Sequence, residues 1–160
     1  MIELLRSLFQ HQAWADDALL GAVQDHPKSM ADEELFKVLH HIVMVQSFFH
    51  CCFTGQAFDP AKATELPKSF EELVQLFKET HAKEQAFLDG VTHEVLERRL
   101  DLKFLGASPT VAVGMTQVVM HSQNHRGQCL TRIRGNGGKP PTLDYILWAK
   151  DHAAGAGTGA

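Results

Sequence analysis

The most informative local pattern in the sequence is a pair of histidines, His121 and His125, in the stretch HSQNH. Residues four apart lie on the same face of an α-helix, about 6 Å from each other. Imidazoles at this spacing can turn toward one ion with Zn–N bonds of about 2.0–2.1 Å, although ordinary surface histidines share the spacing. Because two ligands seldom hold a metal alone, a third must come from elsewhere in the chain.

The third ligand has candidates in a second apolar segment, residues 30–54. His40 falls on the polar side of this segment and is expected to be solvated. His41 and His50 flank its buried face on opposite edges, so periodicity does not choose between them. The buried positions that define this face are Leu35, Leu39, Ile42, Val45, Phe49 and Phe53.

The elements that must position these histidines are four amphipathic helices. Hydrophobic periodicity and capping residues predict them over the ranges 2–24, 30–54, 69–90 and 115–134. A short hairpin over about 99–113 and a short last helix over about 143–150 are predicted as well. An all-α four-helix bundle follows from this pattern.

Composition places the chain in a broad class. At 160 residues it fits one domain, which we expect to span 1–152 with a flexible tail over 153–160. A net charge of −4 without a basic stripe argues against nucleic acid as a partner. No run approaches the ~20 unbroken apolar residues that cross a membrane, and the N-terminus does not resemble a signal peptide. With three cysteines, an odd number, the pattern favours a reducing, cytoplasmic location.

Several stretches resemble the DinB-like (damage-inducible) family, which is related to thiol-dependent S-transferases. The stretches are HQAWADDALL, HIVMVQSFFHCCFTG, HSQNHRGQ and IRGNGGKPPTLDYILW. Carried over by position, the resemblance implies His41 as the first metal ligand, since its spacing to Gly55 is kept, and His121 and His125 as the other two. It also implies an up-down-down-up bundle, one divalent ion such as zinc or nickel, and a homodimer.

Three further residues are candidates for supporting the metal ligands or for binding substrate. Gln128 lies one turn beyond His125 and could orient it or line a pocket. Arg132 is on the same stripe and could hold an anionic group, with a surface role as the alternative. Since the resemblance implies His41 as the ligand, His50 remains a candidate for a supporting polar role.

The neighbours of His125 have structural interpretations. Arg126 is expected to form a structural salt bridge, Gly127 to allow close packing against a neighbour, and Cys129 to be a buried, reduced thiol. Five remaining histidines have no visible partner and are expected at the surface: His11, His26, His81, His93 and His152.

Three neutral imidazoles would leave a bound ion its full positive charge and an open position. Such an ion can bind a thiol as its thiolate or lower the pKa of bound water toward about 7. The first hypothesis is therefore transfer of a low-molecular-weight thiol to an electrophile. The alternatives are a hydrolase that uses metal-bound hydroxide and a non-catalytic, stress-associated metal-binding dimer.

Overall fold

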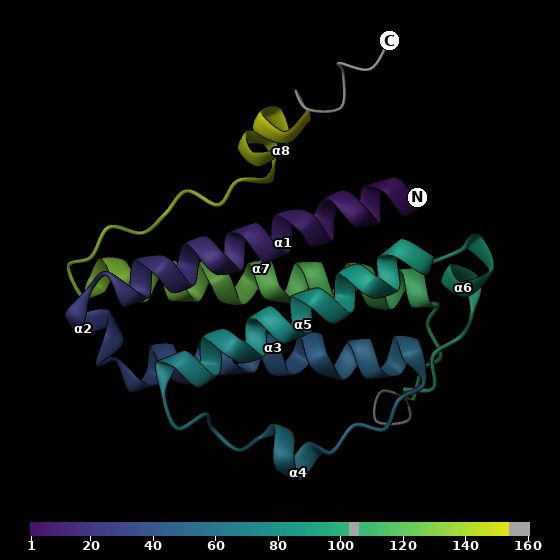
Figure 1. The fold of residues 1–160 in the computed structure, drawn as a ribbon, viewed down its shortest axis with the longest axis horizontal. Helices are drawn as coiled ribbons and strands as arrows, with labels where there is room; N and C mark the ends of the chain where they lie inside the picture. Colours follow the sequence, from purple (N-terminus) through teal and green to yellow (C-terminus); the bar gives the residue numbers. More distant parts are fainter. Residues whose placement is uncertain (103–105, 154–160) are drawn as a thin grey trace.

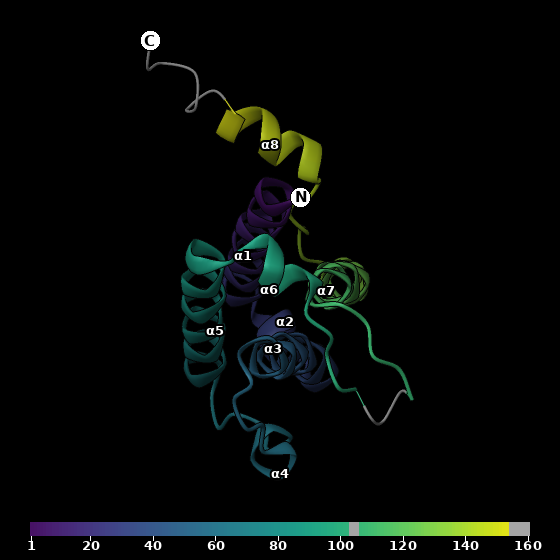
Figure 2. The ribbon, with the colours of Figure 1, turned by 90° about the vertical axis from the view of Figure 1, so that its right-hand side faces the viewer.

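The fold is all-α, as predicted. The computed structural model describes residues 1–102 and 106–153. The long helices are α1 (Ile2–Gln24), α3 (Glu33–Thr54), α5 (Phe70–Gly90) and α7 (Val111–Gly135). α1 and α3 each pack against both α5 and α7, so the four helices enclose a common core. Figure 2 shows α3 and α7 nearly end-on, with α1 and α5 beside them.

Shorter helices occupy the connections. They are α2 (Pro27–Met30), α4 (Pro60–Ala63), α6 (His93–Glu97) and α8 (Tyr145–Ala153). Figure 1 shows α4 beside α3, and α8 packs on the outer side of α1 at the end of an extended segment. The sequence predicts α8 but not α2, α4 or α6, because helices this short have no hydrophobic period to detect.

Capping side chains explain where the long helices begin. The Asp32 carboxylate accepts a hydrogen bond from the backbone N–H of Leu35 at 3.0 Å, and α3 ends at Gly55 with φ +73°. The Thr110 hydroxyl accepts from the N–H of Val113, so α7 begins at Val111. The predicted start at 115 was therefore four residues too late.

The predicted hairpin over 99–113 is not formed as a ladder. The described residues contain two isolated antiparallel bridges, Arg99 with Thr110 and Leu102 with Ala107. The early start of α7 leaves the second strand too short to pair further. Residues 103–105 of the predicted hairpin, and 154–160 of the predicted tail, lie outside the described residues.

A polar layer divides the core into two apolar clusters. One cluster contains Leu19, Leu39, Phe77 and Ile133, and the other Leu5, Phe53, Leu88 and Met115. Each long helix contributes buried polar side chains to the layer between them. These are Gln12, Asp16, Gln46, Thr80, Glu84, Ser122 and Arg126.

The packing glycine of α7 is Gly114 rather than Gly127. A Cβ at Gly127 would meet nothing within 4 Å, so the predicted close packing there is wrong. A Cβ at Gly114 would lie 2.7 Å from Leu100 Cδ1 and 2.9 Å from Phe53 Cε1. Because Gly114 has no side chain, α7 can approach Phe53 of α3 and Leu100 in the segment that precedes α7.

Among the described residues, α3 is the one helix long and apolar enough to span a membrane by length and composition. In its apolar 18-residue window, 44% of the residues are buried inside the protein. A helix that packs its apolar face into the core of a bundle meets the same criterion, because its apolar side chains face other helices.

We expect Gly114→Ala to lower the free energy of unfolding by about 1–3 kcal/mol, because the new methyl group overpacks against a phenyl ring. Gly127→Ala is the matched control on the same helix and should raise it by about 0.5–1 kcal/mol through helix propensity. Urea unfolding of both variants measures the difference. Equal stabilisation by both substitutions would contradict this account of the packing.

Candidate metal centre

The structure brings His41 of α3 together with His121 and His125 of α7. One ring nitrogen from each lies within 4.8 Å of the others, and the Nε2 atoms of His41 and His121 are 3.2 Å apart. Two ligands at 2.0–2.1 Å from a tetrahedral ion are separated by about 3.4 Å. The three imidazoles therefore fit one ion after small side-chain rotations.

Burial favours the neutral, ligating form of His121 and His41. It lowers the pKa of His121 to about 4, with a smaller effect from the neighbouring His125 and His41. The pKa of His41 is lowered by burial and then by His125. A neutral ring offers a lone pair to a metal near neutral pH, so the donor set suits a divalent cation.

Gln128 lies where it can orient His125. Its Oε1 is 3.0 Å from His125 Nδ1. An amide oxygen only accepts, so Nδ1 of His125 must donate and Nε2 keeps its lone pair. A partner of this kind sets the tautomer and ring orientation of a metal-binding histidine.

The other two candidates lie elsewhere. Arg132 forms a two-pronged ion pair with Asp32, in which Nη2 lies 2.7 Å from Oδ1, and it thereby joins the end of α7 to the start of α3. His50 is buried edge-on against Phe87, with ring centroids 6.3 Å apart. His50 follows His41 by nine positions, a rotation of about 180° that places the two on opposite faces of α3.

His40 is buried, and the prediction that it is solvated was wrong. It is 7% exposed, and burial lowers its pKa. A hydrogen bond between its ring and the backbone of Ala63 shows why: α4 folds over this face of α3. A helical wheel treats one helix alone, so it does not include burial by a connecting segment that is distant in the sequence.

Further into the core from the three imidazoles, the Asp16 carboxylate joins all four long helices. Its oxygens contact Arg126 Nη1 at 2.8 Å, Gln46 Nε2 at 2.8 Å and His81 Nε2 at 3.1 Å. Burial alone would raise the pKa of Asp16, but Arg126 and His81 hold it below its ordinary value. Arg126 is fully buried, so its predicted structural salt bridge is confirmed.

Of the histidines expected at the surface, His11 is buried and His81 is half-buried. His81 is paired with Asp16, which raises its pKa against the opposing effect of burial. His11 is 4% exposed, with its Nε2 2.9 Å from the carbonyl oxygen of Leu143. The sequence signal was present: Asp16 falls on the apolar face of α1, where a charge requires a buried partner.

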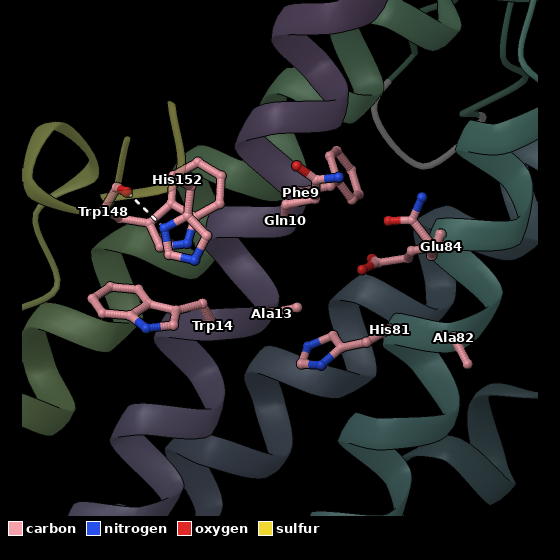
Figure 3. Close-up of a pocket in the computed structure, with 10 residues that line it drawn as sticks. Phe9, Gln10, Ala13, Trp14, His81, Ala82, Glu84, Trp148 and His152 are labelled. Carbon is pink, nitrogen blue, oxygen red and sulfur yellow. Dashed lines mark hydrogen bonds between the residues drawn. The ribbon is translucent and has the colours of Figure 1, made fainter. Parts of the chain in front are cut away.

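A cavity of about 610 Å³ lies between α1, α5 and α8, next to this polar layer. Figure 3 shows His81 and Glu84 pointing from α5 toward α1, with Trp14 and Trp148 on the far side. Glu84 is buried, with its Oε2 3.3 Å from Gln12 Nε2 and its Oε1 without a described partner. Burial raises the pKa of Glu84 to about 8.

The thiol of Cys129 also faces the core. It is fully buried, and burial raises its pKa to about 12. The predicted burial of Cys129 is confirmed, its thiol forms no disulfide, and it is not one of the three grouped ligands.

Comparisons with known proteins agree with this architecture. The sequence model of the DinB family matches residues 1–155. Among solved structures, the fold is similar to that of a DinB-like protein from Bacillus cereus ATCC 10987, with a TM-score of 0.61 and 17% sequence identity over 84% of this chain and 89% of that chain. At this identity the likeness concerns the fold alone. No curated protein gives a significant match.

We expect Glu84→Gln to reduce the loss of stability between about pH 4.5 and 8. Because burial raises the pKa of Glu84 from 4.5 to about 8, its contribution to the free energy of unfolding is complete at the lower pH and is lost as the pH rises. One group can contribute a slope of up to about 1.4 kcal/mol per pH unit.

Urea unfolding across this range measures the slope in wild type and variant. His81 contributes in the same direction, so the difference between the two proteins isolates Glu84. Glu79→Gln, an exposed position on α5, is the control. Identical slopes in wild type and Glu84→Gln would show that the carboxyl group is ionised when folded.

Proposed function

Because this chain belongs to the DinB family, we propose that it is a divalent-metal protein in which His41, His121 and His125 bind zinc or nickel, and that it transfers a low-molecular-weight thiol to an electrophile. The observation that carries the proposal is the convergence of three ring nitrogens within 4.8 Å. We further propose the up-down-down-up topology, a homodimer and a cytoplasmic location.

The donor set determines the kind of chemistry available. A divalent ion held by three neutral ligands supplies an undiminished positive charge, which favours the thiolate form of a bound thiol. No carboxylate belongs to the cluster among the described residues, so the chain itself does not neutralise that charge.

The roles of the chain's own side chains follow from their contacts. The three imidazoles would hold the ion, and Gln128 Oε1 accepts from His125 Nδ1–H in the tautomer that leaves Nε2 free. The three imidazoles are half-buried, so part of each ring is closed to bulk water. Arg126 is committed to Asp16 and takes no part in the transfer.

The same positive charge would act on water as it acts on a thiol. Hydrolysis of an ester or amide is therefore the alternative activity, and a non-catalytic metal-binding dimer is the alternative without chemistry. The relation of the family to thiol S-transferases, which the sequence resemblance implies, favours the thiol.

Alanine at any of the three ligand positions should abolish stoichiometric metal binding, because two histidines seldom hold an ion alone. Elemental analysis of protein reconstituted with zinc or nickel should give about one ion per chain in wild type. His40→Ala is the matched control, since His40 precedes a ligand on the same helix and lies outside the cluster. Loss of metal in His40→Ala with retention in His41→Ala would reverse the assignment on α3.

Thiol transfer is tested with monochlorobimane and a panel of cysteine, glutathione and coenzyme A. The metal-loaded protein should accelerate consumption of at least one thiol by about 10-fold or more over the His41/His121/His125 triple alanine variant. Hydrolysis of 4-nitrophenyl acetate without any thiol would favour the hydrolase instead. Stoichiometric metal without either activity would leave the non-catalytic binding protein.

A further inference from the structure

A second cavity of about 610 Å³ adjoins the three imidazoles, between α3 and the first half of α7. His121 is part of its wall as well as part of the histidine cluster. The volume lies within the range of about 300–1,000 Å³ that is typical of small-molecule sites.

The antiparallel course of α3 and α7 explains why the cavity and the cluster are neighbours. His41 faces His121, while Phe49, further along α3, faces Gly114, earlier in α7. A Cβ built on Gly114 would lie 3.6 Å from Phe49 Cδ1. Residues between these two crossing points therefore lead from the imidazoles into the cavity, and Val45 and Gln117 occupy these positions.

The described residues of the wall are mostly apolar. Their polar members are Gln117 and His121, and none of the described lining residues is Asp, Glu, Lys or Arg. Phe48 meets Phe49 and Phe58 edge-on, with ring centroids 5.2 Å and 5.1 Å apart. Aromatic side chains interlocked in this way offer a preformed surface for an apolar group.

We propose that this cavity binds the uncharged, apolar body of the substrate, an aromatic or branched aliphatic group, while the reacting end of the same molecule lies at the three imidazoles. The identity of the reacting end rests on the proposed function, but the preference of the cavity does not. A charged body is disfavoured because the described lining residues offer no charged partner for it. Gln117 is the one described amide that could hydrogen-bond to a polar atom between the two ends.

The preference of the cavity is tested with N-phenyl-1-naphthylamine, an uncharged probe whose fluorescence rises in apolar surroundings. Wild type and a His41/His125 double alanine variant should bind it equally, since no metal is required and neither residue lines the cavity. Val113→Asp places a charge at the wall and should raise the dissociation constant by about 10-fold or more, whereas Val113→Leu should not.

Met120→Asp is the matched control. Met120 and Val113 lie on the same helix and are 65% and 56% exposed, so neither substitution should disturb folding. Met120 does not line the cavity. Absence of probe binding in wild type, or equal weakening by Val113→Asp and Met120→Asp, would overturn the inference, while metal analysis would still decide the proposed function separately.

The continuity of cavity and cluster is tested with two metal-binding hydroxamic acids on the zinc-loaded protein. Calorimetry should show benzohydroxamic acid binding about 10-fold or more tightly than acetohydroxamic acid, because the phenyl group enters the cavity. Val113→Asp should remove most of this advantage without changing the affinity for acetohydroxamic acid. Equal affinities of wild type for both compounds would show that the cavity and the cluster do not hold one molecule.

Discussion

The registers of the four long helices depend on one buried carboxylate. Asp16 of α1 is 1% exposed, and its partners Gln46, His81 and Arg126 come from the other three helices. An unpaired charge in such surroundings costs several kcal/mol, so a slip or rotation of any helix is opposed. Arg126 directly follows His125, so the ion pair with Asp16 also sets the rotation of α7 that turns the two histidines of α7 toward α3.

The rotation of α7 decides which of its side chains face the core and which lie at the edge of the polar layer. Residues that face inward, such as Ser122 and Arg126, complete the polar layer and find partners within the protein. The neighbours at the edge of the same layer are His121 and His125, whose ring nitrogens converge with that of His41 rather than with a carboxylate. Asp16 is therefore paired with Arg126 and His81 inside the bundle, whereas the three imidazoles lie at the boundary between core and solvent.

Local signals in the sequence were enough for the main framework. Caps and periodicity predicted the bounds of α1 and the end of α3, and the spacing of His121 and His125 predicted their convergence. Errors arose where a distant segment decides the environment. α4 covers His40, Asp16 pairs with His81, and the segment before α7 packs onto Gly114. Periodicity also left His41 and His50 as equal candidates, because it reports distance from the core and not which neighbouring helix lies opposite.

The placement of the three imidazoles on two helices has a consequence for chain entropy. His121 and His125 are close in any helical form of their segment, but His41 is 80 residues away from His121 along the chain. An ion shared by all three would close a loop of that length and would exclude the many extended conformations of the unfolded chain. A complete donor set therefore exists only once α3 and α7 have docked, which makes its assembly a measure of tertiary structure rather than of helix content.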